Sequence, residues 1–240
     1  MTFFVRLLFL FAGVFLFPFF MKAQTDYNIT DSSGLKQGDW VKFWDNGVVR
    51  YKGRFKDDKP VGEFKYYYPS GKLKTVLIYQ KDSLKAHSIS YYESGNKLAE
   101  GDFKDQQKEG EWIYYHDDGT SVSLVEHYEH GKLDGKKITY YVNQKVVYEI
   151  IEYQDGIKNG EWKRFFPDGK IMTKSFYRNG KLDGPFIQFT DEGDTLLKGN
   201  YQDGEQQGEW IFYDDTTGYP VRKEVYQKGR LIKTERTDKH

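Results

Sequence analysis

The chain lacks cysteine altogether, and its 36 basic residues are matched by 36 acidic ones. The absence of cysteine excludes disulfides, thiolate nucleophiles, cysteine zinc sites and lipid attachment through cysteine. A formal net charge of zero is not the clustered excess of basic residues that nucleic-acid binding needs. We therefore expect a fold without covalent cross-links and a partner that is not a nucleic acid.

Proline is also scarce, at 6 residues, whereas aromatic residues make up 18% of the chain and glycine contributes 24 residues. A disordered chain would be poor in aromatic residues. Large rings and many glycines are instead typical of β-strands separated by tight turns. The composition therefore predicts an all-β protein.

The first 24 residues have the plan of a secretory signal. Arg6 is followed by a run without charged residues from Leu7 to Met21, and Ala23 precedes Gln24. This run is shorter than the roughly 20 residues of a membrane-spanning helix. We predict a signal peptide over residues 1–23 and export to the periplasm, the cell surface or the medium. The alternative is an uncleaved anchor, which would be the only membrane contact.

A repeat of 24 or 25 residues runs through the rest of the sequence. With the residue before the aromatic strand as position one, eight units begin at Gly38, Gly62, Ala86, Gly110, Gly135, Gly160, Gly184 and Gly208. Position six is aromatic in all eight: Phe43, Tyr67, Tyr91, Tyr115, Tyr140, Phe165, Phe189 and Tyr213. Position three is aromatic in six units, and Ser88 and Lys137 are the exceptions. Such regularity is typical of repeat architectures.

Each unit has the pattern of a β-hairpin. Dipeptides such as Asn46-Gly47 and Asp118-Gly119 are strong turn signals, because glycine takes positive φ without steric cost. A lone hairpin is not stable in water, so the units must cover each other's edges. The predicted fold is all-β, with tandem hairpins stacked into one elongated, twisted antiparallel sheet. We divide the chain into a signal (1–23), a cap (24–37), the repeats (38–231) and a charged tail (232–240).

The alternation of side chains along a strand predicts which face packs. Positions four and six share one face of the sheet. Position four is aliphatic in six units, at Val41, Ile89, Ile113, Ile138, Ile187 and Ile211. This face is therefore apolar almost throughout, and we expect it to be the core.

The repeats resemble MORN repeats, in the bacterial variant called the YwqK family antitoxin of toxin–antitoxin systems. The shared elements are Gly-x-Trp-x-x-Tyr-Tyr-x-x-Gly and a Tyr-x-x-Gly-x-x-x-Gly connector, as between Tyr128 and Gly135. The resemblance spans roughly residues 34–231. It implies an interaction module without catalytic activity, and the antitoxin name implies a toxin as partner.

Residues that could carry chemistry are few. The stretch from Glu126 to His130 holds the only local cluster of possible metal ligands, but residues three apart on a strand point to opposite faces. A solvated strand end explains this stretch better than a metal site. The recurring acidic residues lie at turns, and neither a nucleophile elbow nor a phosphate-binding loop is present. We expect no enzyme activity, cofactor or metal.

The candidate partner-binding surface is the aromatic row at position seven: Trp44, Tyr68, Tyr92, His116, Tyr141 and Phe166. If exposed, these rings suit contact with a protein or a cell-envelope polymer. The alternative is that they flank the position-three rings in a second small core. We expect an exported scaffold. An antitoxin-like neutraliser and a module that binds the membrane surface are alternatives, the second suggested by lysine-rich turns.

Overall fold

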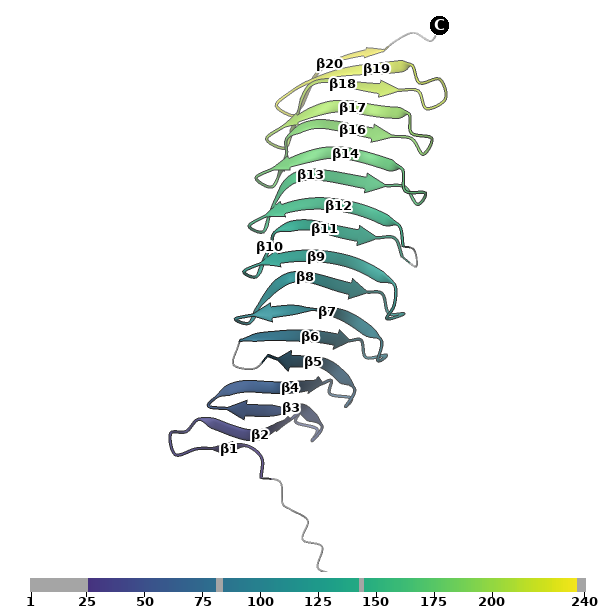
Figure 1. The fold of residues 1–240 in the computed structure, drawn as a ribbon. Coiled ribbons are helices and arrows are strands. Elements are labelled where there is room, and N and C mark those ends of the chain that lie inside the picture. The colour runs from purple at the N-terminus through teal and green to yellow at the C-terminus, as the bar shows by residue number, and fades with distance from the viewer. Residues whose placement is uncertain (1–25, 81–83, 143–144, 237–240) are drawn as a thin grey trace, which may run out of the picture.

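The computed structural model describes residues 26–80, 84–142 and 145–236, and these residues form one sheet (Figure 1). The strands are β1 (Ile29–Thr30), β2 (Lys36–Phe43), β3 (Val49–Lys56), β4 (Lys59–Tyr67), β5 (Leu73–Tyr79), β6 (Lys85–Tyr91), β7 (Lys97–Lys104), β8 (Gln107–Tyr115), β9 (Val122–Glu129), β10 (Lys132–Leu133), β11 (Gly135–Tyr140), β12 (Val147–Gln154), β13 (Ile157–Phe165), β14 (Ile171–Arg178), β15 (Lys181–Leu182), β16 (Gly184–Phe189), β17 (Thr195–Gln202), β18 (Glu205–Tyr213), β19 (Pro220–Gln227) and β20 (Arg230–Arg236).

Each long strand pairs with the next long strand in sequence, and every pairing is antiparallel. Strand β2 pairs with β3, β3 with β4, and so on to β19 and β20. The short strands β10 and β15 lie in the connections, where β9 and β14 also pair with β11 and β16. The result is a long, open, twisted sheet, in which the units follow one another along the axis (Figure 1). The predicted fold of tandem hairpins is confirmed.

The two turns of each unit have different geometry. In the first turn the N–H of Gly47 donates to the carbonyl of Trp44 at 2.9 Å, and the strand register shifts beside it. Only the glycine of Asn46-Gly47 has positive φ, at 79°. In the second turn both residues have positive φ, as at Asp155 (50°) and Gly156 (83°). The second turns are therefore the tight two-residue hairpins, which need left-handed backbone at both positions.

The buried face is the one that carries position three, so the prediction that positions four and six form the core is wrong. Trp112 and Trp210 at position three are 4% and 1% exposed, whereas Phe43 at position six is 49% exposed. The reason is volume. Indole and phenyl rings at position three lie flat over the neighbouring strands, and few aliphatic side chains could cover as much backbone.

Small residues on the adjacent strands make room for these rings. A Cβ at Gly101 would lie 2.4 Å from Trp112, and a Cβ at Gly199 would lie 2.2 Å from Trp210. Ser88 and Ser175, in the same row across the sheet, are also fully buried. The rings pack edge to face along the axis, as Tyr201 does on Trp210 with centroids 5.0 Å apart. The core is thus a single aromatic layer on one face of the sheet.

The ends of the sheet differ from each other. At the N-terminal end, β1 covers part of β2, and this arrangement lies in the predicted cap. At the C-terminal end, residues 232–236 belong to β20, so the predicted boundary of the charged tail at residue 232 falls inside a strand. The predicted signal segment, residues 1–23, lies outside the described residues. Among the described residues, no helix is long and apolar enough to span a membrane.

Candidate functional site

The position-seven rings lie at the strand ends beside the first turns, where they link consecutive units. The hydroxyl of Tyr68 donates to the carbonyl of Tyr91 at 2.8 Å. Tyr92 does the same to Tyr115 at 2.8 Å, and Tyr141 donates to Phe165 at 2.6 Å. In each pair the acceptor is the position-six carbonyl of the next unit, so the row stitches neighbouring hairpins together.

Of the other three members of the row, Trp44 makes the same kind of hydrogen bond to the next unit, and His116 and Phe166 do not. The indole N–H of Trp44 donates to the carbonyl of Tyr67 at 3.2 Å. Nε2 of His116 is buried without a hydrogen-bond partner in the described part of the chain, and the Phe166 ring has no polar atom. All six side chains are half-buried. The row is therefore partly accessible, and four of its six members use their polar atoms within the sheet.

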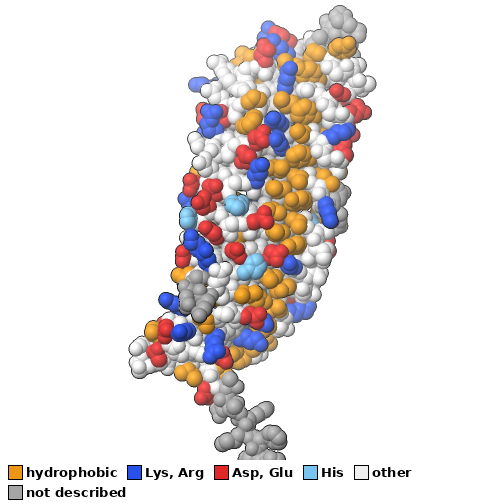
Figure 2. Space-filling model, viewed as in Figure 1, with side chains coloured by type: hydrophobic (Ala, Val, Ile, Leu, Met, Phe, Trp, Pro, Cys, Tyr) orange, Lys and Arg blue, Asp and Glu red, His pale blue; other side chains and the backbone are white. Residues whose placement is uncertain are grey.

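A second row of rings lies on the face of the sheet opposite the aromatic core. We call the apolar residues at positions four and six of this face the apolar band: Val41, Phe43, Tyr67, Ile89, Tyr91, Ile113, Tyr115, Ile138, Tyr140, Phe165, Ile187, Phe189, Ile211 and Tyr213. Position four is a lysine in the other two units, at Lys65 and Lys163. Phe43 is exposed and the others are half-buried. A strip of hydrophobic side chains runs along the long axis in Figure 2, with charged side chains along one side of it.

Aliphatic partners on the adjacent strands extend the apolar band. Tyr67 pairs with Leu73, Tyr115 with Val122, and Phe165 with Ile171. In the middle units, position four continues across the sheet from Ile113 through Val125 and Ile138 to Ile150. The position-four row is thus continuously apolar across the middle units, from Ile113 to Ile150, whereas Lys52, Lys65, Lys163 and Lys174 interrupt it elsewhere.

Some of the charges beside the apolar band neutralise each other. Glu63 and Glu161 at position two pair with the lysines that occupy position four, Lys65 at 2.6 Å and Lys163 at 2.7 Å. These side chains are at least a quarter exposed, so such pairs contribute little to stability. Their effect is local, because Lys52 and Lys198 on the same face lie over the rings of Tyr67 and Tyr213 without an ion pair among the described residues.

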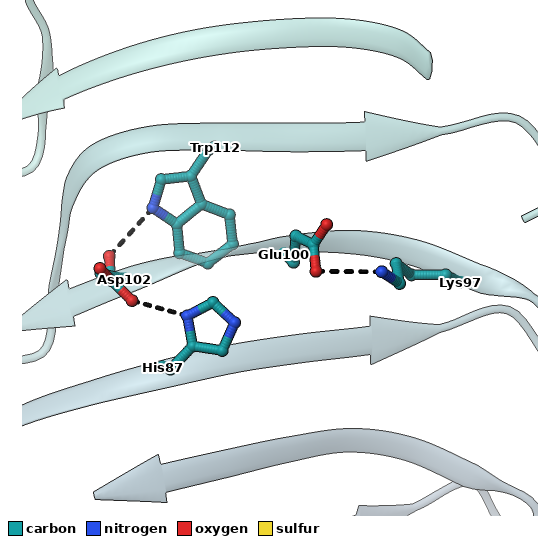
Figure 3. Close-up of polar contacts among 5 residues, drawn as sticks. All are labelled: His87, Lys97, Glu100, Asp102 and Trp112. Atoms are coloured by element: carbon teal, nitrogen blue, oxygen red, sulfur yellow. Dashed lines mark hydrogen bonds and ion pairs between the residues drawn. The ribbon is translucent and has the colours of Figure 1, made fainter. Parts of the chain in front are cut away.

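The polar group shown in Figure 3 lies near the middle of the sheet. Nδ1 of His87 lies 2.7 Å from Asp102 Oδ1, and Lys97 Nζ lies 3.0 Å from Glu100 Oε2. The indole N–H of Trp112 donates to the carbonyl of Asp102 at 3.0 Å. The Tyr115 hydroxyl also donates to Glu100, and this bond, opposed in part by burial, lowers the pKa of the carboxyl. These contacts join β6, β7 and β8.

A lysine lies within the aromatic layer on the buried face. Lys108 Nζ is 4.5 Å from the centroid of Trp112 and 4.7 Å from that of Tyr128. It also donates to the hydroxyl of Tyr114. Burial lowers the pKa of Lys108, although the charge of Glu126 acts in the opposite direction. Cation–π contact and hydrogen bonds thus stabilise a partly desolvated ammonium.

The burial of Glu126 is not expected from the sequence. We predicted that the Glu126–His130 stretch is a solvated strand end, but Glu126 is buried, with its carboxylate 3.3 Å from Lys137 Nζ. The Tyr128 hydroxyl donates to it at 2.7 Å. Burial, followed by this bond, raises the pKa of Tyr128 to about 12. Lys137 was the signal, since it stands where six other units have a ring.

Catalysis or metal binding needs several polar side chains that converge on one point. The polar side chains described above instead pair between adjacent strands. Within residues 26–80, 84–142 and 145–236, no three histidine, aspartate or glutamate side chains converge as metal ligands. His127 is exposed on β9, and His130 lies in a turn with its N–H donating to Glu109 at 3.0 Å. The arrangement offers surfaces for contact.

Comparison with known families agrees with the hairpin units. The family described as MORN repeat variant matches residues 36–57, 60–81 and 158–179. These stretches correspond to the strand pairs β2–β3, β4–β5 and β13–β14. The chain thus carries repeats of the MORN variant type. MORN repeats are in general non-catalytic modules that bind proteins or lipids. The match concerns the repeat type and does not extend to the YwqK antitoxin name.

Other comparisons add little to the MORN assignment. No curated protein matches the chain. One similar solved structure is a chain in the crystal structure of TcdB2-TccC3-Cdc42, with 12% identity and a TM-score of 0.21. The match covers 80% of the present chain and 14% of that one. At this TM-score the likeness supports no argument about fold or function.

Proposed function

We propose that the protein is an exported, non-catalytic scaffold that binds an elongated protein partner along the apolar band. The observation that carries the proposal is the continuous row of half-exposed rings on the face opposite the aromatic core. Aromatic side chains are enriched among the residues that dominate protein–protein binding energy. Contiguous apolar surface on a soluble protein commonly marks an interaction site.

The charges around the apolar band favour a protein over an anionic membrane. A membrane-binding surface needs an excess of free basic residues. Several lysines on this face are paired with acidic side chains, as Lys65 is with Glu63 and Lys223 with Glu209, and Lys52 and Lys198 lie over the rings of Tyr67 and Tyr213. An apolar, neutral strip with a charged margin resembles the core and rim of protein interfaces.

The test compares two sets of surface variants. Replacing Tyr67, Tyr91 and Tyr140 by serine removes three rings of the band, and we expect partner capture from the cell-envelope fraction to be lost. Circular dichroism and thermal unfolding should show that the variant still folds. Retained capture by a folded band variant would refute the proposed surface. Binding to anionic vesicles that depends on the same rings would favour the lipid alternative.

The position-seven row is a second candidate surface, because its rings are half-exposed. Its hydroxyls can be removed without removing the rings, by Tyr68→Phe and Tyr92→Phe. If capture depends on this row, replacing Trp44 and Phe166 by serine should abolish it while the band variant still binds. The two surfaces are therefore distinguishable in one experiment.

Export is part of the same proposal and depends on the apolar segment at residues 1–23. Mass spectrometry of the N-terminus in fractionated cells tests it. A chain that starts near Gln24 outside the cytosol is the expected result. An intact Met1 in the cytosol would instead favour the antitoxin alternative, which rests on family analogy.

A further inference from the structure

The C-terminal edge of the sheet is an open strand. Strand β20 pairs with β19, and no other strand among the described residues pairs with it. All seven residues of β20 are exposed, and Leu231 and Ile232 are 51% and 60% exposed. Figure 1 shows β20 at the upper end of the sheet, beyond which no described strand lies. An edge of this kind presents unpaired backbone N–H and C=O groups.

The opposite edge is covered. At the N-terminal end, the N–H of Asn28 donates to the carbonyl of Asp39 at 2.9 Å. The side-chain oxygen of Asn28 accepts from the N–H of Val41 at 2.9 Å. Ile29 and Thr30 of β1 then pair with Gln37 and Lys36 of β2. The chain thus covers part of one edge and leaves the other open within the described residues.

The open edge is basic in a protein whose net charge is zero. Residues 220–236 contain six basic side chains, Arg222, Lys223, Lys228, Arg230, Lys233 and Arg236, and the acidic side chains Glu224 and Glu235. Glu224 pairs with Arg222 at 3.3 Å, and Glu235 pairs with Lys233 at 2.5 Å. Arg230 and Arg236 have no ion pair with any described residue. Free positive charge therefore remains along the edge.

We propose that β20 is a docking edge for an extended acidic segment of another protein, which adds to the sheet as a further strand. Backbone hydrogen bonds to β20 would supply much of the affinity, as in other cases of strand addition. Acidic side chains on one face of the added strand would meet Arg230 and Arg236, and apolar side chains on its other face would cover Leu231. This contact is separate from the apolar band, which lies on a face of the sheet.

The same charges disfavour a second copy of the chain as the occupant. In a full-length antiparallel pairing of two β20 strands, Lys233 would lie opposite its own counterpart, and Arg230 would lie opposite Arg236. Like charges placed directly opposite each other destabilise a strand pair. Basic residues on an edge strand are a known protection against self-association. They do not protect against an acidic strand.

The experiment uses a blocked, fluorescein-labelled peptide of alternating glutamate and valine, seven residues long, added to the whole chain. Fluorescence anisotropy measures its binding. Two peptides serve as controls: the lysine–valine analogue, and the glutamate–valine peptide with alternate backbone nitrogens methylated. We expect the glutamate–valine peptide alone to bind. Charge reversal by Arg230→Glu and Arg236→Glu should weaken binding by about tenfold or more.

The outcomes separate strand addition from simple charge attraction. Both arginines are exposed, so the double variant should fold, and thermal unfolding checks this. Arg230→Gln with Arg236→Gln should weaken binding less than the charge reversal does. Absence of binding would overturn the proposal. The proposal would also be overturned if backbone methylation of the peptide left its binding unchanged. It would be overturned as well if anionic vesicles abolished the binding by occupying the same residues. Band variants should bind the peptide as the native chain does.

Discussion

Adding one methyl group at Gly199 should destabilise the protein, because the aromatic layer leaves no space there. A Cβ at this position would lie 2.2 Å from Cδ2 and 2.4 Å from Cε2 of Trp210. Favourable carbon–carbon contacts are about 3.5–4.0 Å. The indole would therefore have to move by more than 1 Å, on the order of the difference between these distances. Trp210 is 1% exposed and packs against Phe186, Tyr201 and Tyr226, so it cannot move freely.

We expect Gly199→Ala to lower the free energy of unfolding by about 1–3 kcal/mol, the usual cost of overpacking a core. The sign is informative, because glycine to alanine at a permissive site stabilises by about 0.4–1 kcal/mol through the unfolded state. Gly199 is a permissive site by its backbone, since it is not among the glycines with positive φ. Only the ring above it opposes the substitution.

Urea denaturation followed by fluorescence and circular dichroism measures the change, with coincident transitions as the check on cooperativity. Asn200→Ala, at the next and exposed residue, is the matched control and should change stability by less than about 0.5 kcal/mol. Trp210→Ala alone should cost about 3–5 kcal/mol. In the double variant Gly199→Ala with Trp210→Ala, the loss should not exceed that of Trp210→Ala. A neutral or stabilising Gly199→Ala, or strictly additive losses, would refute the packing argument.

Three further predictions follow from the same geometry. Trp112→Ala should cost about 3–5 kcal/mol in urea denaturation, and Tyr115→Ala on the other face about 1–2 kcal/mol; equal losses would contradict the assignment of the core. The raised pKa of Tyr128, about 12, means that its hydroxyl stabilises the fold below the usual tyrosine pKa of 10.0 and that this contribution is lost as the pH rises through about 12. Unfolding midpoints across that range should therefore fall less steeply in Tyr128→Phe than in the native chain, and an unchanged slope would exclude this residue. Tyr92→Phe should cost about 1 kcal/mol for its hydrogen bond to the next unit, and a loss near zero in thermal unfolding would mean that the bond is exchanged for water without cost.

The repeat and the hairpin fold could be predicted from the sequence because the signals recur in most units. A ring at position six occurs in all eight units and a glycine at the first turn in six, so the departures do not obscure the pattern. The core face could not be predicted by counting apolar residues, because both faces carry them. The deciding residues are Gly53, Gly101 and Gly199, which lie in strand interiors and leave room for rings on neighbouring strands. That relation depends on register between strands, which the sequence does not state.

The contacts made by the candidate surfaces could not be predicted from the sequence either. The spacing of the position-seven row predicted its alignment, but not that Tyr68, Tyr92 and Tyr141 donate to carbonyls of the following unit. Nor could it show that Glu126 is buried beside Lys137, since that pairing joins β9 to β11. Both contacts arise between units, where small differences in register decide which atoms meet.

The most direct test of the central proposal is partner capture by the native chain and by the band variant with Tyr67, Tyr91 and Tyr140 replaced by serine. Both proteins are immobilised at equal amounts, exposed to the same envelope fraction, and compared by quantitative mass spectrometry. We predict that a protein retained by the native chain is absent from the folded band variant. Equal retention by both would contradict the assignment of the apolar band as the binding surface.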